Sequence, residues 1–394
     1  MLTINTGSSS LKVAVYDGET PVLKGEVKRI GNPGSRITVA DAEGKRLIDR
    51  DAAGADHGAA LQAVLACLKD QGLGSNLDAA GHRVVYGGTF YSGPRPITPE
   101  LVANLGEFVP IAPDHLPQAI QAINIIEQTF PGLPQVACFD TAFHRTMPRV
   151  AQIFPLPRRV ANENIIRYGF HGLSYEYIMR ELGSRSHNQA QGRIVIAHLG
   201  NGASMAAVSD GKSIDTTMGF TPAGGLMMGT RPGDIDPGVI LYLLIEKAMT
   251  PSALNELINR QSGLLGISET SEDMRDLLEK EGADPRAAEA VALFCHYARA
   301  HVGSLAATLG GLDTLIFTAG IGEYAAPIRQ RICQGLEFLG IRLDQDLNNT
   351  HAPVISREDS PVTVRVMHTD EDFMIARHTA DLIGKSGVSD LALA

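Results

Sequence analysis

The stretch from His198 to Pro237 reads HLGNGASMAAVSDGKSIDTTMGFTPAGGLMMGTRPGDIDP and decides the fold. A β-branched run at 193–197 precedes its glycine loop, an apolar run at 204–209 follows, and Asp210-Gly211 is a hairpin-turn signal. A glycine loop between two strands exposes several backbone N–H groups at one place, which suits a phosphate. The glycines could instead serve only as turns, so a single loop of this kind is weak evidence.

The same arrangement occurs at the amino terminus, where residues 2–18 read LTINTGSSSLKVAVYDG. A constant offset that places Gly7 on Gly200 also aligns an Ala-Val pair and the Asp-Gly turn of the two stretches. A third strand is expected after each copy, at 22–27 and at 213–216. This internal repetition predicts two related domains that face one nucleotide cleft.

Composition and charge exclude several classes of protein. The net charge of −10 argues against a general nucleic-acid binder. No apolar run approaches the roughly 20 residues that a membrane helix needs, and the chain opens directly on a strand rather than on a secretory signal. The four cysteines lie in apolar segments without metal-ligand spacing. We therefore expect a cytoplasmic protein with no membrane partner and with buried thiols.

Apolar periodicity predicts most of the remaining elements. Strands are expected at 81–86, 136–139, 315–317 and 362–366, and helices at 61–68, 238–247 and 370–383, with others starting near 117, 271, 285 and 326. Residues 31–57 are rich in Gly, Asp and Ala and are predicted to be a variable excursion. The strand at 136–139 places Asp140 at its carboxyl end, where catalytic groups gather in open α/β sheets.

An ordered set of motifs along nearly the whole chain resembles the acetate kinase family. The motifs are NTGSSSLK (5–12), GHRVVYGG (81–88), FDTAFH (139–144), YGFHG (168–172), HLGNGAS (198–204), the run at 218–237, SGLLGIS (262–268), FTAGIGE (317–323) and MIARHT (374–379). The family is part of the superfamily of actin, hexokinase and the heat-shock chaperone ATPases. The resemblance implies an α/β fold made of two duplicated actin/hexokinase-like (ribonuclease H-like) domains around a central nucleotide cleft. The expected domains are 1–144 plus 372–394, and 145–371.

The resemblance also implies an activity. It is the ATP-dependent phosphorylation of a short-chain carboxylate, most simply acetate + ATP ⇌ acetyl phosphate + ADP, by direct in-line transfer. The alternatives are a propionate or hydroxy-acid kinase of the same fold and, more remotely, a nucleotide-driven conformational protein without kinase activity. The resemblance implies Mg²⁺ as cofactor, with Mn²⁺ as a substitute, and a homodimer.

Four residues are the catalytic candidates. Arg83 and Arg231 lie in glycine-flanked motifs, and a guanidinium forks onto carboxylate and phosphate oxygens. Taken alone, most arginines are solvated surface groups, and a histidine beside an aromatic, such as His171, is usually a core residue. Asp140 could equally cap the end of its strand. The resemblance makes Arg83 the anchor of the substrate carboxylate, Arg231 and His171 the partners of the transferring phosphoryl group, and Asp140 a group that orients substrate, water or metal.

The resemblance assigns three further sets of residues. The substrate pocket would contain Arg83, Val85, Phe170 and Pro222. The nucleotide would contact Lys12, His198, Asn201, Gly202, Asp273, Met274, Arg275, Gly320, Ile321, Gly322 and Glu323. Asn5 and Glu371 would bind Mg²⁺ directly or through water, because this ion takes few protein ligands.

Three positions depart from the family pattern. Tyr324 replaces the usual Asn and could pack on the adenine base or change the preferred base. Asp370 also replaces an Asn, which adds negative charge near the metal and leaves the exact ligand open. Asp114 stands where the family has a pocket-lining Leu. It could cap the helix at Pro117, pair with His115, or accept a hydrogen bond from a hydroxyl-bearing substrate.

The role of Asp114 is testable on the native protein and on Asp114→Leu. We expect acetate, propionate, glycolate and lactate to keep the same rank order of rates in both, because an unpaired carboxylate in an apolar pocket wall is costly and would repel the substrate. Hydroxy acids that lead in the native protein and fall behind in the variant would contradict this and would indicate a hydroxy-acid kinase.

Overall fold

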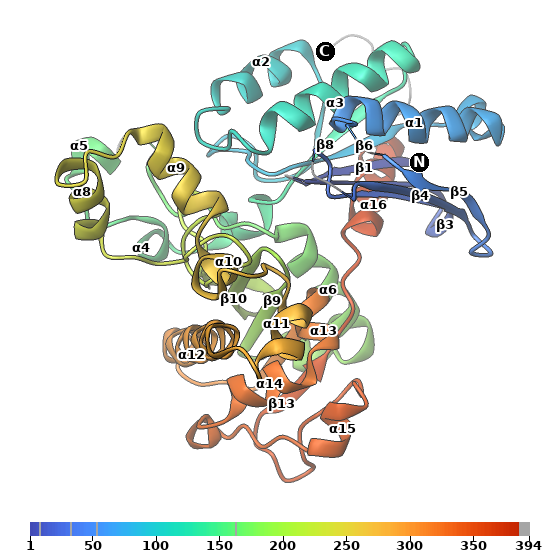
Figure 1. Ribbon diagram of the computed structural model, residues 1–394. Coiled ribbons are helices and arrows are strands. Elements are labelled where there is room, and N and C mark those ends of the chain that lie inside the picture. The colour runs from blue at the N-terminus through green and yellow to red at the C-terminus, as the bar shows by residue number, and fades with distance from the viewer. Residues whose placement is uncertain (8, 32–33, 53, 162–163, 386–394) are drawn as a thin grey trace. The chain divides into compact units, whose positions relative to one another are not determined.

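The computed structural model describes residues 1–7, 9–31, 34–52, 54–161 and 164–385 (Figure 1). Residue contacts divide the chain into two compact units. Unit 1 consists of Met1–Phe143 and the segment from Asp370 onward, and unit 2 consists of His144–Thr369. The chain therefore passes from one unit to the other twice, and its last helix belongs to the unit that also holds the amino terminus.

A mixed sheet forms the centre of unit 1, with the strand order β5-β4-β3-β2-β1-β6-β8-β7. Strands β1 to β5 pair antiparallel, whereas β1, β6 and β8 run parallel. The strands are β1 Leu2–Thr6, β2 Ser10–Asp17, β3 Thr20–Lys28, β4 Arg36–Asp41, β5 Arg46–Asp51, β6 Ala80–Val84, β7 Arg95–Pro96 and β8 Gln135–Phe139. The helices are α1 His57–Asp70, η1 Leu73–Asn76, α2 Pro99–Glu107, α3 Leu116–Thr129 and α16 Glu371–Lys385, and η2 Ala142–Thr146 follows β8.

Side chains of β2 alternate between two apolar layers, as the period of a strand requires. Leu11 and Val13 pack in the large core that β1 to β4 form with α1 and α3. Ala14 and Tyr16 pack instead with Ala376 of α16. Helices α1 and α3 therefore cover one face of the sheet and α16 covers the other, as Figure 1 shows.

Helix α16 approaches β6 so closely that only glycine fits at position 81. A β-carbon there would overlap the hydroxyl of Thr379 and lie 2.6 Å from Ile375 Cγ2. Thr379 and Ile375 are both buried in α16. This contact fixes the carboxyl-terminal helix against the strand that carries Arg83.

The sheet of unit 2 has the strand order β11-β10-β9-β12-β13, and α12 packs against β9, β10 and β11. The strands are β9 Ile194–Leu199, β10 Ala203–Ser209, β11 Lys212–Thr216, β12 Thr314–Thr318 and β13 Thr363–Val366. The helices are α4 Arg149–Gln152, α5 Arg158–Ala161, α6 Gly172–Arg185, α7 His187–Ala190, α8 Pro237–Ile245, α9 Pro251–Arg260, α10 Gly263–Ser268, α11 Met274–Lys280, α12 Pro285–Thr308, α13 Ala319–Tyr324, α14 Ala326–Cys333, η3 Glu337–Leu339 and α15 Gln345–Asn349.

The two sheets share one topology. In each, three antiparallel strands made from consecutive segments (β1 to β3, and β9 to β11) are followed by two parallel strands on the side of the first strand (β6 and β8, and β12 and β13). The prediction of a duplicated α/β fold is confirmed.

The glycine loops of the two copies differ in length, so the constant offset does not hold through the hairpin. Thr6 pairs with Leu11 in the first hairpin, whereas Leu199 pairs with Ala203 in the second, so the paired positions are one residue further apart along the chain in the first. One strand of the second hairpin is therefore displaced by one position from where the sequence alignment with the first would place it. A shift of one position places the aligned side chains of that strand on opposite faces of the two sheets, because side chains alternate along a strand.

The predicted excursion at 31–57 was wrong in part, because it contains β4 and β5. Ile37 and Val39 are buried, and their alternation with polar neighbours is the strand signal that the Gly- and Asp-rich composition concealed. The other predicted elements are confirmed, including the long helix from Pro285. Among the described residues, no helix is both long and apolar enough to cross a membrane.

Candidate functional site

Arg83 and Asp140 form a buried ion pair at the edge of the unit 1 sheet. Strands β6 and β8 are parallel neighbours, and the Asp140 N–H that follows β8 donates to Val84 O at 3.0 Å. Arg83 donates to Asp140 Oδ2 from Nε at 3.0 Å and from Nη2 at 2.5 Å. Burial works against the Arg83 cation, but Asp140 and Glu371 outweigh it and raise the pKa of Arg83 above its usual value.

Asn5 connects this ion pair with the start of α16. Its Oδ1 accepts from Arg83 Nη1 at 3.2 Å, and its Nδ2 donates to Glu371 Oε2 at 3.0 Å and to Asp372 Oδ1 at 3.3 Å. Burial raises the pKa of the Asp372 carboxyl to about 6, and the neighbouring acidic side chains add to this shift while Lys12 opposes it. The structure thus brings Asn5, Arg83, Asp140 and Glu371 together, all within unit 1.

Asp370 has a structural role at the start of α16. Its Oδ1 accepts from the Phe373 N–H at 2.9 Å, and its Oδ2 lies 3.7 Å from Lys24 Nζ. The hydroxyl of Tyr16 reaches the same carboxylate at 3.5 Å. The structure therefore assigns Asp370 to capping and charge pairing at the helix N-terminus, where an anion is favoured.

In unit 2, a histidine and an arginine lie against the glycine loop between β9 and β10. A β-carbon built on Gly202 would lie 2.9 Å from Arg231 Nη2 and 3.4 Å from His171 Nε2. A β-carbon on Gly200 would lie 4.0 Å from His198 Nε2. The loop is thus approached by two imidazoles and a guanidinium, a set of donors suited to an anion.

The two imidazoles stack face to face. The ring centroids of His171 and His198 lie 4.2 Å apart, with 18° between the ring planes. His171 precedes α6 with φ at 58°, a left-handed conformation that is unusual for a non-glycine residue. Strain of this kind persists where the surrounding structure fixes it, often at functional sites.

Arg231 is held by the loop that follows the unit 2 hairpin. Its Nη1 donates to Pro222 O at 2.6 Å, and the Met228 N–H donates to Arg231 O at 2.9 Å. Gly263 packs beneath it, where a β-carbon would lie 2.8 Å from the Arg231 backbone nitrogen. The guanidinium is therefore presented from a tightly packed turn.

The predicted nucleotide segments lie on two short helices of unit 2. Asp273 caps α11 and pairs with the exposed Arg275 at 2.9 Å, and the partner lowers the pKa of the Asp273 carboxyl. Met274 is buried, so its side chain belongs to the core. Glu323 turns back from α13 and accepts from the Ala319 N–H at 2.9 Å and from His368 Nδ1 at 2.9 Å. Gly320, Ile321 and Gly322 lie between Ala319 and Glu323 in α13.

The remaining predicted residues are dispersed. Lys12 is exposed on β2, and Val85 is buried in unit 1, whereas Phe170 and Pro222 belong to unit 2. Their assembly into one substrate pocket stays a prediction. The side chain of Asn201 lies against Gly229, where a β-carbon would collide with its Oδ1. Asp114 is half-buried and lies two residues before α3.

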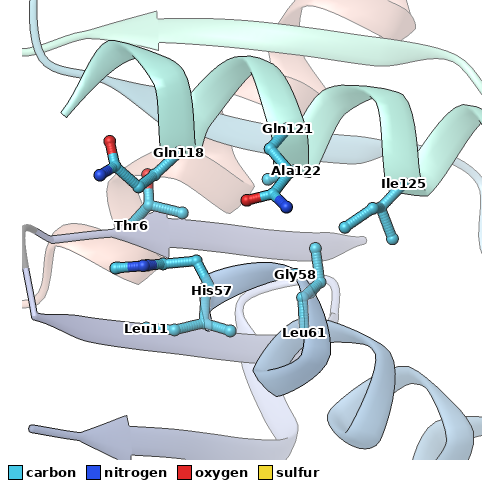
Figure 2. A pocket seen from close by; sticks show the side chains of 9 residues that line it. All are labelled: Thr6, Leu11, His57, Gly58, Leu61, Gln118, Gln121, Ala122 and Ile125. Carbon is cyan, nitrogen blue, oxygen red and sulfur yellow. The ribbon is translucent and has the colours of Figure 1, made fainter. Parts of the chain in front are cut away.

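A narrow hollow lies beside the first glycine loop (Figure 2). Its lining is Thr6, Leu11, His57, Gly58, Leu61, Gln118, Gln121, Ala122 and Ile125. It has no room for a water molecule. His57 Nε2 lies 2.9 Å from Gly7 O, a hydrogen bond that ties the loop to α1. The hollow is a packing feature that supports the loop.

Four hydroxyl residues next to the histidines were not found in the sequence analysis. His171 Nδ1 lies 2.8 Å from Ser204 Oγ, which lies 2.5 Å from the Tyr175 hydroxyl. His198 Nδ1 lies 2.8 Å from Ser174 Oγ, which accepts from Thr369 Oγ1 at 2.8 Å. The spacing of His171 and Tyr175, one helical turn apart, was the available signal.

Comparisons with known proteins identify the family of the chain. Residues 1–377 match the Acetokinase family. An acetate kinase of Rhodopseudomonas palustris is 46% identical over 388 residues, which cover 96% of this chain and 97% of that protein. The crystal structure of Porphyromonas gingivalis acetate kinase has a TM-score of 0.86 at 38% identity, covering 97% of this chain and 99% of that one. A propionate kinase of Francisella tularensis has a TM-score of 0.90 at 35% identity, with the same coverage.

The fold and these similarities define the protein as a phosphotransferase whose acceptor is a carboxyl group. The chain belongs to the acetokinase family. The remote alternative of a nucleotide-driven protein without kinase activity finds no support in these relatives.

The packing around Gly202 predicts the effect of Gly202→Ala. The added methyl would press on Arg231 Nη2 and His171 Nε2, whose long side chains can move, so we expect a folded protein. Transfer should slow by about tenfold or more, because misplaced donors stabilise the transition state poorly. Rates of acyl phosphate formation measure this. Gly303→Ala in α12, where a β-carbon meets open space, is the control, and equal rates in both variants would contradict the role of the loop.

Proposed function

We propose that the protein catalyses reversible phosphoryl transfer between ATP and acetate by direct in-line displacement. The observation that carries this proposal is the guanidinium of Arg83, held in one orientation by the fully buried carboxylate of Asp140. The nucleophile of the reaction is already an anion, so catalysis needs positioning and charge neutralisation rather than a strong base.

Arg83 binds the substrate carboxylate in this proposal. In the described part of the chain, three of its five N–H groups have partners, on Nε, Nη1 and Nη2. One N–H group on each terminal nitrogen is therefore available for an incoming carboxylate. Asp140 acts through Arg83, as the group that fixes its orientation. Val85, Phe170 and Pro222 would supply apolar contacts to the methyl group.

The glycine loop of unit 2 binds the phosphates of ATP in this proposal. Gly202 and Asn201 would contact the phosphates through the loop. Arg231, His171 and His198 would donate to the phosphoryl oxygens, because their side chains lie within 4.0 Å of a β-carbon position on the loop. Charge spreads over these oxygens in the transition state, so fixed donors there lower the barrier.

Mg²⁺ would be held at the start of α16. The carboxylates of Glu371 and Asp372 provide hard oxygen atoms, the ligands that this ion prefers, and Asn5 donates to both of them through Nδ2, so in this proposal it acts chiefly through water and by positioning. Among the described residues, no group of three or more His, Cys, Asp and Glu side chains could hold a metal by itself. The ion would neutralise charge on the phosphates, and Lys12 on β2 would add a further positive charge.

The nucleoside would lie against the helices α11 and α13. Asp273, Met274 and Arg275 on one side, and Gly320 to Glu323 on the other, are the proposed contacts, with Met274 contributing its backbone. Tyr324 ends α13 and is 70% exposed, with its ring centroid 6.5 Å from that of His351. This exposed aromatic side chain offers a stacking surface for the base.

Propionate is a second candidate acceptor. The propionate kinase of Francisella tularensis superposes on this chain with a TM-score of 0.90. One additional methylene changes binding in an apolar pocket by only about 1–3 kcal/mol, so both acids can be substrates of one site. Comparing kcat/KM for acetate and propionate decides between them.

The two arginines can be tested by Arg83→Lys and Arg231→Lys. Lysine keeps the positive charge that buried Asp140 needs but lacks the fork, so the variants should fold. We expect Arg83→Lys to raise KM for acetate, and both variants to lower kcat by about a hundredfold or more. The matched controls are Arg36→Lys in unit 1 and Arg342→Lys in unit 2, both on exposed ion pairs. Near-native rates in either test variant would contradict its proposed role.

We also propose that the protein is a homodimer that buries α8. This helix reads PGVILYLLI, and none of its residues is buried. Val239, Leu241, Tyr242 and Ile245 are 48% to 67% exposed. A helix that is apolar all round normally requires cover, and a second copy would supply it.

Sedimentation of the native protein and of Ile245→Glu tests this interface. The native protein should sediment as a dimer at micromolar concentration, and the variant as a monomer, because a carboxylate would be buried without a partner. Phe338→Glu changes an exposed apolar side chain on η3, outside α8, and this variant should remain a dimer. A monomeric native protein would contradict the proposal, as would a dimeric Ile245→Glu.

A further inference from the structure

Two chains of hydroxyl groups end on the stacked histidines of unit 2. One runs from Tyr175 through Ser204 to His171, and the other from Thr369 through Ser174 to His198. In each chain a serine hydroxyl contacts Nδ1 of the ring, and a second hydroxyl contacts the serine. The serine is Ser204 beside Tyr175 in one chain, and Ser174 beside Thr369 in the other. Tyr175, Ser174 and Ser204 are fully buried, so neither serine exchanges its partner for bulk water.

The direction of the hydrogen bonds fixes where each ring carries its proton. Thr369 donates to Ser174 at 2.8 Å, and Ser174 has a single proton of its own, which points to His198 Nδ1. Nδ1 of His198 is then an acceptor, and the ring proton is on Nε2. The ring nitrogen that faces the glycine loop is the one that can donate.

The same reasoning applies to His171. Of the two hydroxyls that meet at 2.5 Å, the phenol of Tyr175 is the more acidic and therefore the better donor. Ser204 accepts from Tyr175 and donates to His171 Nδ1 at 2.8 Å. This again leaves the proton on Nε2, the atom nearest to Gly202.

The stacking favours neutral imidazole rings, so each ring would donate to the anion through a selected tautomer rather than by carrying a charge. Two imidazolium rings with centroids 4.2 Å apart, beside the Arg231 cation, would repel one another. Neutral rings stack without that cost, but a neutral imidazole donates from one nitrogen only. Hydrogen-bond partners that hold the proton on Nε2 of both rings would supply two donors to one anion.

We propose that Ser204 with Tyr175, and Ser174 with Thr369, are positioning residues that hold His171 and His198 as Nε2–H tautomers toward the glycine loop. This inference rests on the proposed function, in which the anion at the loop is the phosphoryl group of ATP. It extends that function to four residues that would not touch the substrate. The second relay begins at Thr369, the last residue of unit 2 before the acidic start of α16.

Ring tautomers can be read directly by ¹H–¹⁵N spectra of protein labelled in histidine, with His171→Gln and His198→Gln used for assignment. We expect Nε2–H at both rings in the native protein. Ser204→Ala and Tyr175→Phe should give His171 a mixture of tautomers and leave His198 unchanged, and Ser174→Ala and Thr369→Val should do the reverse. A native ring with its proton on Nδ1 would overturn the proposal, as would variants that leave the tautomer unchanged.

Kinetics then test the link to phosphoryl transfer. Ser204→Ala should lower kcat by about tenfold with KM for acetate little changed, and Ser204→Thr, which keeps the hydroxyl, should restore it. The matched control is Ser356→Ala, which removes a buried hydroxyl that accepts from Val364 N–H and has no histidine partner. Altered tautomers with an unaltered kcat would overturn the positioning role.

The spectra separate this inference from the proposed function. If the native protein does not phosphorylate acetate but the tautomers follow the hydroxyl variants as expected, the relays stand and the proposed acceptor falls. If acetate is phosphorylated but both rings keep their tautomers in every variant, the proposed function stands and the relays fall.

Discussion

The buried pair of Arg83 and Asp140 is the constraint on which unit 1 depends. Neither charge can be removed alone, because the other would stay buried without compensation, at a cost of several kcal/mol. Their meeting follows from the sheet, since β6 and β8 are parallel neighbours and end at one edge. A pair that stabilises the sheet thereby also fixes the direction in which the guanidinium can bind an anion.

In unit 2, the missing side chains of two glycines allow positively charged and polar donors to gather where an anion can bind. Gly200 and Gly202 leave room for two imidazoles and a guanidinium to approach the backbone of one loop. Hydroxyl groups behind the rings would then select which nitrogen donates. In the proposed function, unit 1 carries the carboxylate anchor and unit 2 carries a set of phosphoryl donors. The topology is shared, and the loop residues differ.

Three adjacent carboxylates show how position decides role. Asp370 caps α16 and pairs with Lys24, whereas Glu371 and Asp372 share the amide of Asn5. The charge of Asp370 is therefore used at the helix end. A helix N-terminus favours all three anions, so the segment can hold three carboxylates in its first turn.

Local patterns in the sequence determined the two hairpins, the glycine loops, most helices and the motifs that carry the candidate residues, because these depend on periodicity and turn chemistry over a few neighbours. Strands β4 and β5 were missed where composition hid a short alternation, and the differing loop lengths were invisible to an alignment at constant offset. Only the tertiary structure decided that Asp140 holds Arg83, that Asp370 is a cap, and that Thr369 reaches Ser174. These partners lie far apart along the chain, and strand order and helix docking, which no local pattern encodes, bring them together.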